Sequence, residues 1–219
     1  MINKQVTSID VALDGIKDGS TVLCGGFGSV GTPDELIDAL LQQGARDLVI
    51  VSNNAGVGTT ALAALIDNNR VRKIICSYPR SDDPRAFDKA YKAGRIELEL
   101  VPQGTLSERM RCAAAGLGAF YSPVSVGTRL AAGKEVREIN GKQYVLEMPL
   151  KGDVALLKAH QADRWGNLSY RKSARNFNPV IATAADLSIV QVHMMVELGE
   201  IDAECVHTPG IFIDRIIVV

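Results

Sequence analysis

A short apolar run that breaks into a glycine-rich loop constrains the fold of this chain more than any other feature. Residues 21–24, Thr-Val-Leu-Cys, predict a buried strand, and glycine follows at positions 25, 26, 28 and 31. Thr32 and Pro33 then precede two acidic residues, which predicts a helix with Thr32 as its N-cap and Pro33 at its first position. A strand, a glycine loop and a helix start in succession can aim backbone N–H groups at an anion or a developing oxyanion.

This loop is not a specific signature by itself. No Gly-Lys-Ser/Thr follows it, as a Walker loop requires, and its glycines do not have the spacing of the dinucleotide-binding fingerprint. A plain connection that packs a helix against a strand uses glycines in the same way. A ligand-binding loop and a tight structural turn therefore both remain open from the local sequence.

The rest of the chain alternates segments with strand-like and helix-like patterns. Apolar runs predict further strands at residues 48–51, 71–77, 96–101, 154–159, 187–192 and 211–219. Helical patterns and capping signals predict helices at residues 8–17, 33–43, 59–68, 84–93, 106–115 and 179–185. Aromatic residues make up only 5% of the chain and hydrophobic residues 47%, a balance that suits a parallel sheet covered by helices.

Two segments interrupt this alternation. Asn140-Gly141 lies between the runs 136–139 and 143–147 and predicts a β-hairpin. Residues 114–128 hold three glycines and a proline, and they predict a long ordered loop. We therefore predict a single α/β domain over residues 1–219, with a mostly parallel open sheet, covering helices and an inserted β-hairpin.

Charge and apolar patterning exclude several classes of partner. The net charge of −1 argues against a nucleic acid or an anionic membrane held by bulk electrostatics. No apolar run reaches the length of a membrane span, and Met-Ile-Asn-Lys opens no signal peptide, so we expect a cytoplasmic protein. The four cysteines are scattered singly, so metal and redox roles are not expected.

Polar side chains follow two of the predicted strands. Asn53 and Asn54 come after the strand at 48–51, and Gln103 comes after the strand at 96–101. Ligands of open α/β sheets gather at the carboxyl ends of the strands, and amide side chains can bind a ligand there. An Asx turn is the structural alternative for the two asparagines.

Several segments together resemble the α subunit of the class I coenzyme A transferases of the 3-oxoacid type. The family signature, an acidic residue or Asn, Gly, apolar residues and Gly-Gly-Phe-x-x-x-Gly-x-Pro, matches residues 18–33. Segments 52–56, 101–105, 171–178 and 207–212 also resemble the family in the same order, so the similarity spans nearly the whole chain. One departure is Ser125, which stands where the family usually has glycine and could alter the backbone of that loop.

The resemblance implies ping-pong transfer of coenzyme A between carboxylates through a covalent glutamyl thioester. The family carries that nucleophilic glutamate in a Ser-Glu-Asn-Gly motif of the β subunit, and this chain does not contain the motif. Ser107-Glu108 is the only Ser-Glu pair and lies in a predicted helix, where it indicates helix capping. We therefore expect no catalytic nucleophile in this chain and an obligate β-subunit partner, in an αβ or α2β2 assembly whose docking hides an extensive apolar surface.

The resemblance also assigns the binding residues. It implies that Asn53, Asn54 and Gln103 line the carboxylate pocket, and that the coenzyme A-contacting loop consists of Gly25, Gly26, Phe27, Gly28, Ser29, Val30 and Gly31. No metal and no permanently bound cofactor are expected, since the coenzyme A thioester is a substrate.

The resemblance favours succinyl-CoA as donor and a 3-oxo acid as acceptor, with 3-oxoadipate first and acetoacetate next. The alternatives are a subunit of an acetate or butyrate CoA-transferase, and a non-catalytic α/β module that binds a small ligand. Arg171, Lys172 and Arg175 could meet a coenzyme A phosphate or a diacid, or could form a solvated or interfacial face. The three histidines, His160, His193 and His207, lie far apart in sequence and predict neither a triad nor a metal site.

Overall fold

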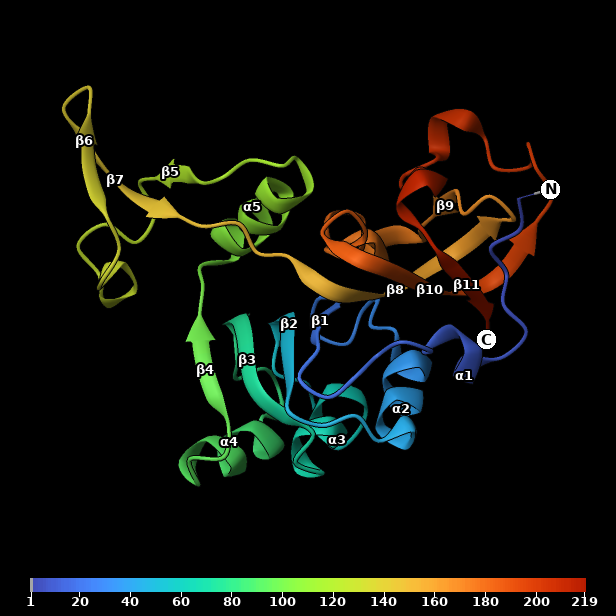
Figure 1. Ribbon diagram of the computed structural model, residues 1–219, viewed down its shortest axis with the longest axis horizontal. Helices are drawn as coiled ribbons and strands as arrows, with labels where there is room; N and C mark the ends of the chain where they lie inside the picture. Colours follow the sequence, from blue (N-terminus) through green and yellow to red (C-terminus); the bar gives the residue numbers. More distant parts are fainter. Residues whose placement is uncertain (1) are drawn as a thin grey trace.

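The computed structural model describes residues 2–219 and is built on one large, mostly parallel sheet (Figure 1). Its strands lie in the order β11-β10-β8-β1-β2-β3-β4, and β9 adds to β8 as an antiparallel strand. The bounds are β1 Thr21–Cys24, β2 Leu48–Asn54, β3 Val71–Tyr78, β4 Glu97–Leu100, β8 Gly152–Asp163, β9 Leu168–Ser169, β10 Ala185–Val196 and β11 Arg215–Val218. The predicted open parallel sheet is confirmed.

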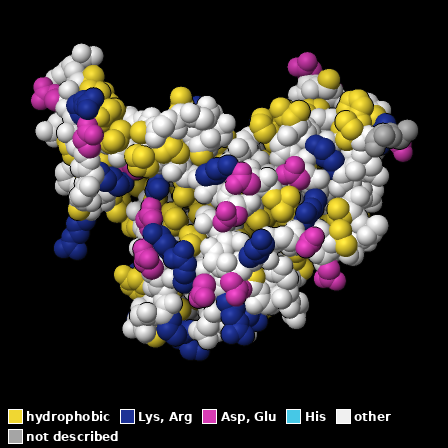
Figure 2. Space-filling model, in the orientation of Figure 1, with side chains coloured by type: hydrophobic (Ala, Val, Ile, Leu, Met, Phe, Trp, Pro, Cys, Tyr) yellow, Lys and Arg dark blue, Asp and Glu magenta, His cyan; other side chains and the backbone are white. Residues whose placement is uncertain are grey.

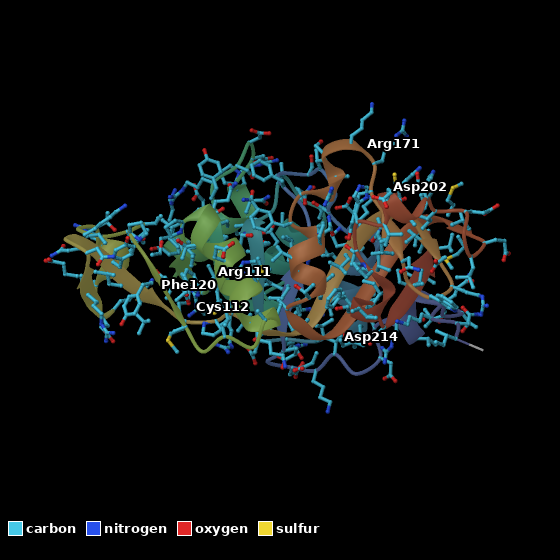
Figure 3. The ribbon with its side chains drawn as sticks, turned by 90° about the horizontal axis from the view of Figure 1, so that it is seen from above. Arg111, Cys112, Phe120, Arg171, Asp202 and Asp214 are labelled. Carbon is cyan, nitrogen blue, oxygen red and sulfur yellow. The ribbon has the colours of Figure 1, made fainter. Side chains whose placement is uncertain are left out.

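Helices cover both faces of this sheet and bury a separate hydrophobic core on each. Figure 1 shows the lower face covered by α2, α3 and α4, and Figure 3 shows α5 and α6 side by side over the upper face. Strand residues alternate between the two cores, so that Val22 and Ile50 pack below the sheet while Leu23 and Val51 pack above it. The helices are α1 Ile9–Ala12, α2 Asp34–Gln43, α3 Ala61–Asp67, α4 Arg85–Lys92, α5 Gln103–Ala114 and α6 Asn178–Ala182.

A second, antiparallel sheet projects from the body at the left of Figure 1. It consists of β5 Phe120–Ser122, β6 Val136–Ile139 and β7 Lys142–Glu147, in the order β5-β7-β6. The predicted hairpin is confirmed, with Asn140 and Gly141 at φ values of 51° and 75°, as a tight two-residue turn requires. The prediction of a continuous loop over residues 114–128 is wrong, because β5 pairs with the far edge of the hairpin. That pairing joins segments too distant in sequence for a local pattern to reveal.

The first and last predicted elements are shorter than expected. Ser8 caps α1 by accepting a hydrogen bond from the N–H of Val11, but the helix ends at Ala12 and the chain turns through Gly15 at φ 95°. At the other end β11 begins only at Arg215, because a 3-10 turn over Gly210–Phe212 comes first. Both differences follow from local turns that the apolar spacing did not reveal.

The start of α2 is also capped differently from the prediction. Pro33 occupies the N-cap position, and the Thr32 hydroxyl donates to the carbonyl of Gly28 at 3.4 Å instead of capping the helix. The N–H of Leu36 donates to Oε1 of the fully buried Gln191, which comes from β10, at 3.1 Å. A distant strand therefore supplies the cap that we expected from Thr32.

Apolar side chains gather at two places on the face shown in Figure 2. One group lies over the projecting sheet and the other over the C-terminal segment at the upper right. Ile211 is the most exposed of the large hydrophobic side chains at 83%, and Met148 beside the projecting sheet is 55% exposed. None of the helices within residues 2–219 has the length and apolar character needed to cross a membrane.

Candidate functional site

The candidate site lies where the direction of the sheet topology reverses. From β1 the chain adds β2, β3 and β4 on one side, and it later adds β8, β10 and β11 on the other. A crevice forms at the carboxyl ends of the strands at such a switch point. The glycine loop after β1, the asparagines at the end of β2 and Gln103 after β4 all lie at this edge.

The glycine loop closes on itself in a tight turn. The N–H of Phe27 donates to the carbonyl of Val30 at 3.0 Å, and the N–H of Val30 donates back at 3.1 Å. Gly28 sits at the tip with φ 61°, in the left-handed region, and a Cβ added there would meet nothing within 4 Å. The tip is thus open on its outer side, so a ligand can approach the backbone closely.

Two asparagines at the start of α6, Asn176 just before the helix and Asn178 at its first position, hold the other end of this loop. Asn178 is fully buried, donates to the carbonyl of Gly31 at 3.1 Å and accepts from the N–H of Lys158 at 3.0 Å. Asn176 donates to the carbonyl of Val30 at 2.9 Å. The family-like segments include both asparagines, but we predicted no role for either of them. The signal that could have revealed this role was the two asparagines at 176 and 178, which lie close together just before the predicted helix at 179–185.

The two adjacent asparagines of β2 are buried, with 5% and 4% of Asn53 and Asn54 exposed. Asn54 forms the predicted Asx turn through Oδ1, which accepts from the N–H of Gly56 at 2.8 Å. Its Nδ2 also donates to the carbonyl of Gly28 at 3.1 Å and ties the loop tip to β2. Asn54 therefore forms the Asx turn that was the structural alternative to ligand binding, and its side chain also positions the glycine loop.

Asn53 and Gln103 contact each other across the crevice. Nδ2 of Asn53 lies 2.9 Å from Oγ of Ser77 and 3.2 Å from Oε1 of Gln103. Gln103 is the first residue of α5, because that helix begins three residues before the predicted start at Leu106. The structure thus brings together two amide side chains that the family resemblance implies for one pocket.

Two cavities meet at Gln103. The first has a volume of about 380 Å³, and its lining includes Gly28, Asn53, Asn54, Tyr78 and Gln103. The second, of about 470 Å³, shares Phe27 and Gln103 with the first and continues to Ser107 and Arg175. Neither lining, within residues 2–219, contains a histidine, cysteine or glutamate. Asp82 is the one carboxylate among the described residues that line the two cavities. The cavities therefore offer hydrogen-bond donors for a small polar ligand, and no glutamate lies among the described residues of their linings.

The remaining sequence candidates lie in different places. Glu108 lies inside α5 and pairs with Arg111 at 2.7 Å on the exposed surface, so Ser107-Glu108 is not a helix cap. Two of the histidines lie far apart in sequence but come together in the fold, since the rings of His160 and His193 stack with their centroids 5.8 Å apart. Adjacent parallel strands carry these two residues, which only the sheet topology reveals.

The three basic residues of segment 171–175 lie on or beside the 3-10 turn Lys172–Arg175 and are exposed. Arg175 lines the second cavity, whereas Arg171 lines a separate cavity that His160 also lines.

The buried thiols are chemically quiet. Burial raises the pKa of Cys24 and of Cys76 to about 12, so neither is a thiolate near neutral pH. Cys112 is also buried, and Cys205 is exposed. Burial of Cys24, Cys76 and Cys112 is typical of free thiols that pack in a hydrophobic core.

Comparison with known proteins places the chain in a family. The family model described as Coenzyme A transferase matches residues 6–219. The chain belongs to the coenzyme A transferase family. The family resemblance inferred from the sequence motifs is thereby confirmed.

Full-length relatives agree with this assignment. The chain is 59% identical to the A-subunit of the 3-oxoadipate CoA-transferase of Pseudomonas putida, over 100% of its own length and 95% of the relative. It is 46% identical to the A-subunit of the succinyl-CoA:3-ketoacid coenzyme A transferase of Helicobacter pylori strain J99, over 98% of the chain and 92% of the relative.

A solved structure with the same fold is the acyl-CoA transferase YdiF of Escherichia coli O157:H7. It is 23% identical with a TM-score of 0.85 over 99% of this chain, and this chain spans 47% of YdiF. At that identity the likeness concerns the fold alone.

Proposed function

We propose that this chain is the α subunit of a 3-oxoacid CoA-transferase, which moves coenzyme A from succinyl-CoA to a 3-oxo acid, with 3-oxoadipate as the favoured acceptor. The observation that carries the proposal is the convergence of the glycine loop, Asn53 and Gln103 on one pair of cavities. The 59% identity with a subunit of the 3-oxoadipate enzyme supports the choice of acceptor over acetoacetate. An acetate or butyrate acceptor remains the alternative to be tested.

Within this proposal the amide side chain of Gln103 binds the carboxylates. Nε2 of Gln103 donates hydrogen bonds to a carboxylate or an oxyanion without adding a positive charge that would pair with a carboxylate nucleophile. Asn53 orients this amide, because its Nδ2 donates to Oε1 of Gln103 at 3.2 Å. The open side of the turn at Gly28 brings the backbone of the loop against the coenzyme A thioester. The loop of residues 25–31 is therefore the proposed coenzyme A contact, with Asn54 holding its tip in place.

The proposal also requires a partner that contributes the nucleophile. A glutamate of the β subunit, in this proposal, attacks the acyl carbon of succinyl-CoA, which releases the coenzyme A thiolate and leaves a mixed anhydride. The thiolate attacks the anhydride at the glutamyl carbon, so that succinate leaves and a glutamyl thioester forms. The acceptor acid then receives coenzyme A from the glutamyl thioester by the same two steps in reverse order. This chain supplies the binding wall of the shared site.

Exposed apolar side chains around the cavities support the docking of such a partner. Phe27 and Tyr78 are 48% and 62% exposed and line the first cavity, and Val30, 47% exposed, lies on the same loop as Phe27. Large apolar side chains at the rim of a polar cavity are typical of a surface that a partner covers. We propose an αβ or α2β2 assembly, and the cytoplasmic location stays a prediction.

A transferase assay with succinyl-CoA tests the proposal on this chain alone and on the chain co-purified with a candidate β subunit. We expect activity with 3-oxoadipate only when both subunits are present. Activity of the chain alone would contradict the missing nucleophile, and turnover with acetate or butyrate but not with 3-oxo acids would favour the alternative acceptors. A complex that forms but transfers no coenzyme A would favour a non-catalytic binding role.

A further inference from the structure

A pair of histidines lies side by side in β8 and β10, near the carboxyl ends of the two strands and on the other side of β1 from Asn53. The two strands run parallel with Ala159 opposite Val192, so the next residues, His160 and His193, are neighbours across the two strands. Their rings stack with centroids 5.8 Å apart and planes inclined by 19°. This arrangement places two imidazoles on one face of the sheet.

The histidines belong to a cavity of about 230 Å³ that is lined almost entirely by basic and neutral groups. Lys158 and His160 come from β8, His193 from β10 and Arg171 from the loop after β9. Figure 3 shows Arg171 at the outer edge of the molecule. The rest of the lining is Gly31, Ala159, Tyr170 and Ala174. No acidic side chain of residues 2–219 lines it.

Most of these basic groups have no partner in the part of the chain that the structure describes. Neither imidazole, nor the guanidinium of Arg171, takes part in a hydrogen bond or an ion pair within residues 2–219. Lys158 is the exception, with Nζ 3.7 Å from Asp34 and 4.0 Å from Glu35, which lie at the start of α2 outside the cavity lining. Tyr170 is engaged, since its hydroxyl lies 2.7 Å from Oγ1 of Thr208.

The geometry favours an anion over a metal ion. A metal binds the in-plane lone pairs of imidazole nitrogens, which must converge on one point, whereas stacked rings hold those lone pairs in nearly parallel planes. Residues 2–219 also contain no group of three His, Cys, Asp or Glu side chains that could hold a metal. Basic side chains from three segments around an open cavity are instead suited to a compact anion with several oxygens.

We propose that this cavity binds a phosphate group through Lys158, His160, His193 and Arg171. The guanidinium of Arg171 and the ammonium of Lys158 donate charge-assisted hydrogen bonds to phosphate oxygens, and each imidazole can donate a ring N–H. Gly31 connects the cavity to the glycine loop, so a bound phosphate lies at the back of that loop. The phosphate belongs either to coenzyme A or to a separate phosphorylated metabolite.

The permanent charges around the cavity are mixed. Lys158 and Arg171 are cationic, while the carboxylates of Asp34 and Glu35 face Lys158 from the start of α2. Glu35 also lines a neighbouring cavity of about 90 Å³ together with Lys158 and His193. Arg171 and His160 do not line that neighbouring cavity, so they are the residues to substitute in a test of anion binding.

Calorimetric titration with sulfate tests the site, because sulfate is a compact tetrahedral oxyanion with the shape of a phosphate group. The protein is the full chain in complex with its partner subunit. We expect saturable binding, and Arg171→Gln or His160→Gln should weaken it by about tenfold. Lys92→Gln, at an exposed position of α4, is the matched control and should bind sulfate like the unchanged protein. Circular dichroism and thermal unfolding verify that each variant is folded.

The same variants identify the source of the phosphate. If sulfate and coenzyme A compete, and Arg171→Gln weakens the binding of coenzyme A, the site belongs to a phosphate of coenzyme A. Simultaneous binding of sulfate and coenzyme A would assign it to a separate phosphorylated metabolite. The proposal is overturned if folded protein shows no saturable sulfate binding, or if His160→Gln and Arg171→Gln bind sulfate as tightly as the control.

Discussion

The carboxamide of Asn178 occupies the space that a side chain on Gly25 would need. A Cβ on Gly25 would lie far inside van der Waals contact with Oδ1 of Asn178. The same carboxamide donates to the carbonyl of Gly31, so one buried side chain joins the first and last residues of the glycine loop. The first glycine of the loop is therefore required by packing against Asn178, whereas Gly28 at the tip faces open space.

Gly25→Ala should destabilise the protein by about 3 kcal/mol, because the added methyl group must displace a fully buried, hydrogen-bonded amide. Urea unfolding of the purified chain measures the free energy of unfolding. Gly104→Ala is the matched control, since a Cβ there meets nothing within 4 Å. If the clash with Asn178 is the cause, Asn178→Ala should lower the free energy of unfolding by less in the Gly25→Ala background than in the unchanged protein. Equal losses of free energy in the two backgrounds would contradict this explanation.

Gln103→Ala should lower turnover by about tenfold or more in the assembled transferase while leaving assembly intact, because it removes one amide donor from the shared cavity. Steady-state kinetics and size-exclusion chromatography separate the two effects. Glu108→Gln, on the exposed side of the same helix, is the control and should keep full activity. Unchanged kinetics for Gln103→Ala would remove this residue from the site, and an inactive Glu108→Gln would point to a nucleophile in this chain.

Ser125→Gly should raise the free energy of unfolding by about 1 kcal/mol, because it relieves backbone strain. Ser125 has φ 79°, in the left-handed region that favours glycine, and its buried hydroxyl has no hydrogen-bond partner within residues 2–219. This loop therefore keeps a glycine-like backbone where the family's usual glycine is replaced. Gly127→Ala, at φ 74° in the same loop, should destabilise by a similar amount. Thermal unfolding of the two variants should shift in opposite directions, and a destabilised Ser125→Gly would contradict the strain.

Glu99 should contribute stability that disappears in acid. Burial alone would raise its pKa, but hydrogen bonds from Arg109 and Lys73, both at 2.8 Å, outweigh burial and hold the pKa below the ordinary value of 4.5. A lowered folded-state pKa means that this stability is fully present above pH 4.5 and is lost as the pH falls through the lower, folded value.

Glu99→Gln should therefore be less stable than the unchanged protein at neutral pH, by about 1 kcal/mol, and the difference should shrink below about pH 4.5. Urea unfolding from neutral pH down to about pH 3 measures this difference. Glu138→Gln, on the exposed strand β6 with no ion pair within residues 2–219, serves as the control and should track the unchanged protein throughout. A difference that stays constant into acid would show that the pairing of Glu99 is not the cause.

Elements whose signals are local can be predicted from neighbouring residues. The strand at 21–24 has the predicted bounds, and Gly44 ends α2 in the left-handed conformation at φ 97° as expected of a helix C-cap. The turn at Asn140-Gly141 likewise needs only two residues that tolerate positive φ. The amide pocket follows from family motifs at the strand ends, because parallel strands place their carboxyl ends at one edge of the sheet.

The order of the strands, and the contacts that this order creates between distant residues, follow from tertiary packing. Insertion of β1 between β2 and β8 sets the place of the crevice, and the same arrangement brings Gln191 to the start of α2 and His160 beside His193. These residue pairs lie far apart in sequence, and each contact depends on the register of buried strands. Most strands, the tight turns and the family could be predicted from the chain's residues, because their signals are local. The remaining arrangement depends on the burial of both faces of the sheet. The strands must be ordered so that the connecting helices cover the apolar surface of both faces at once.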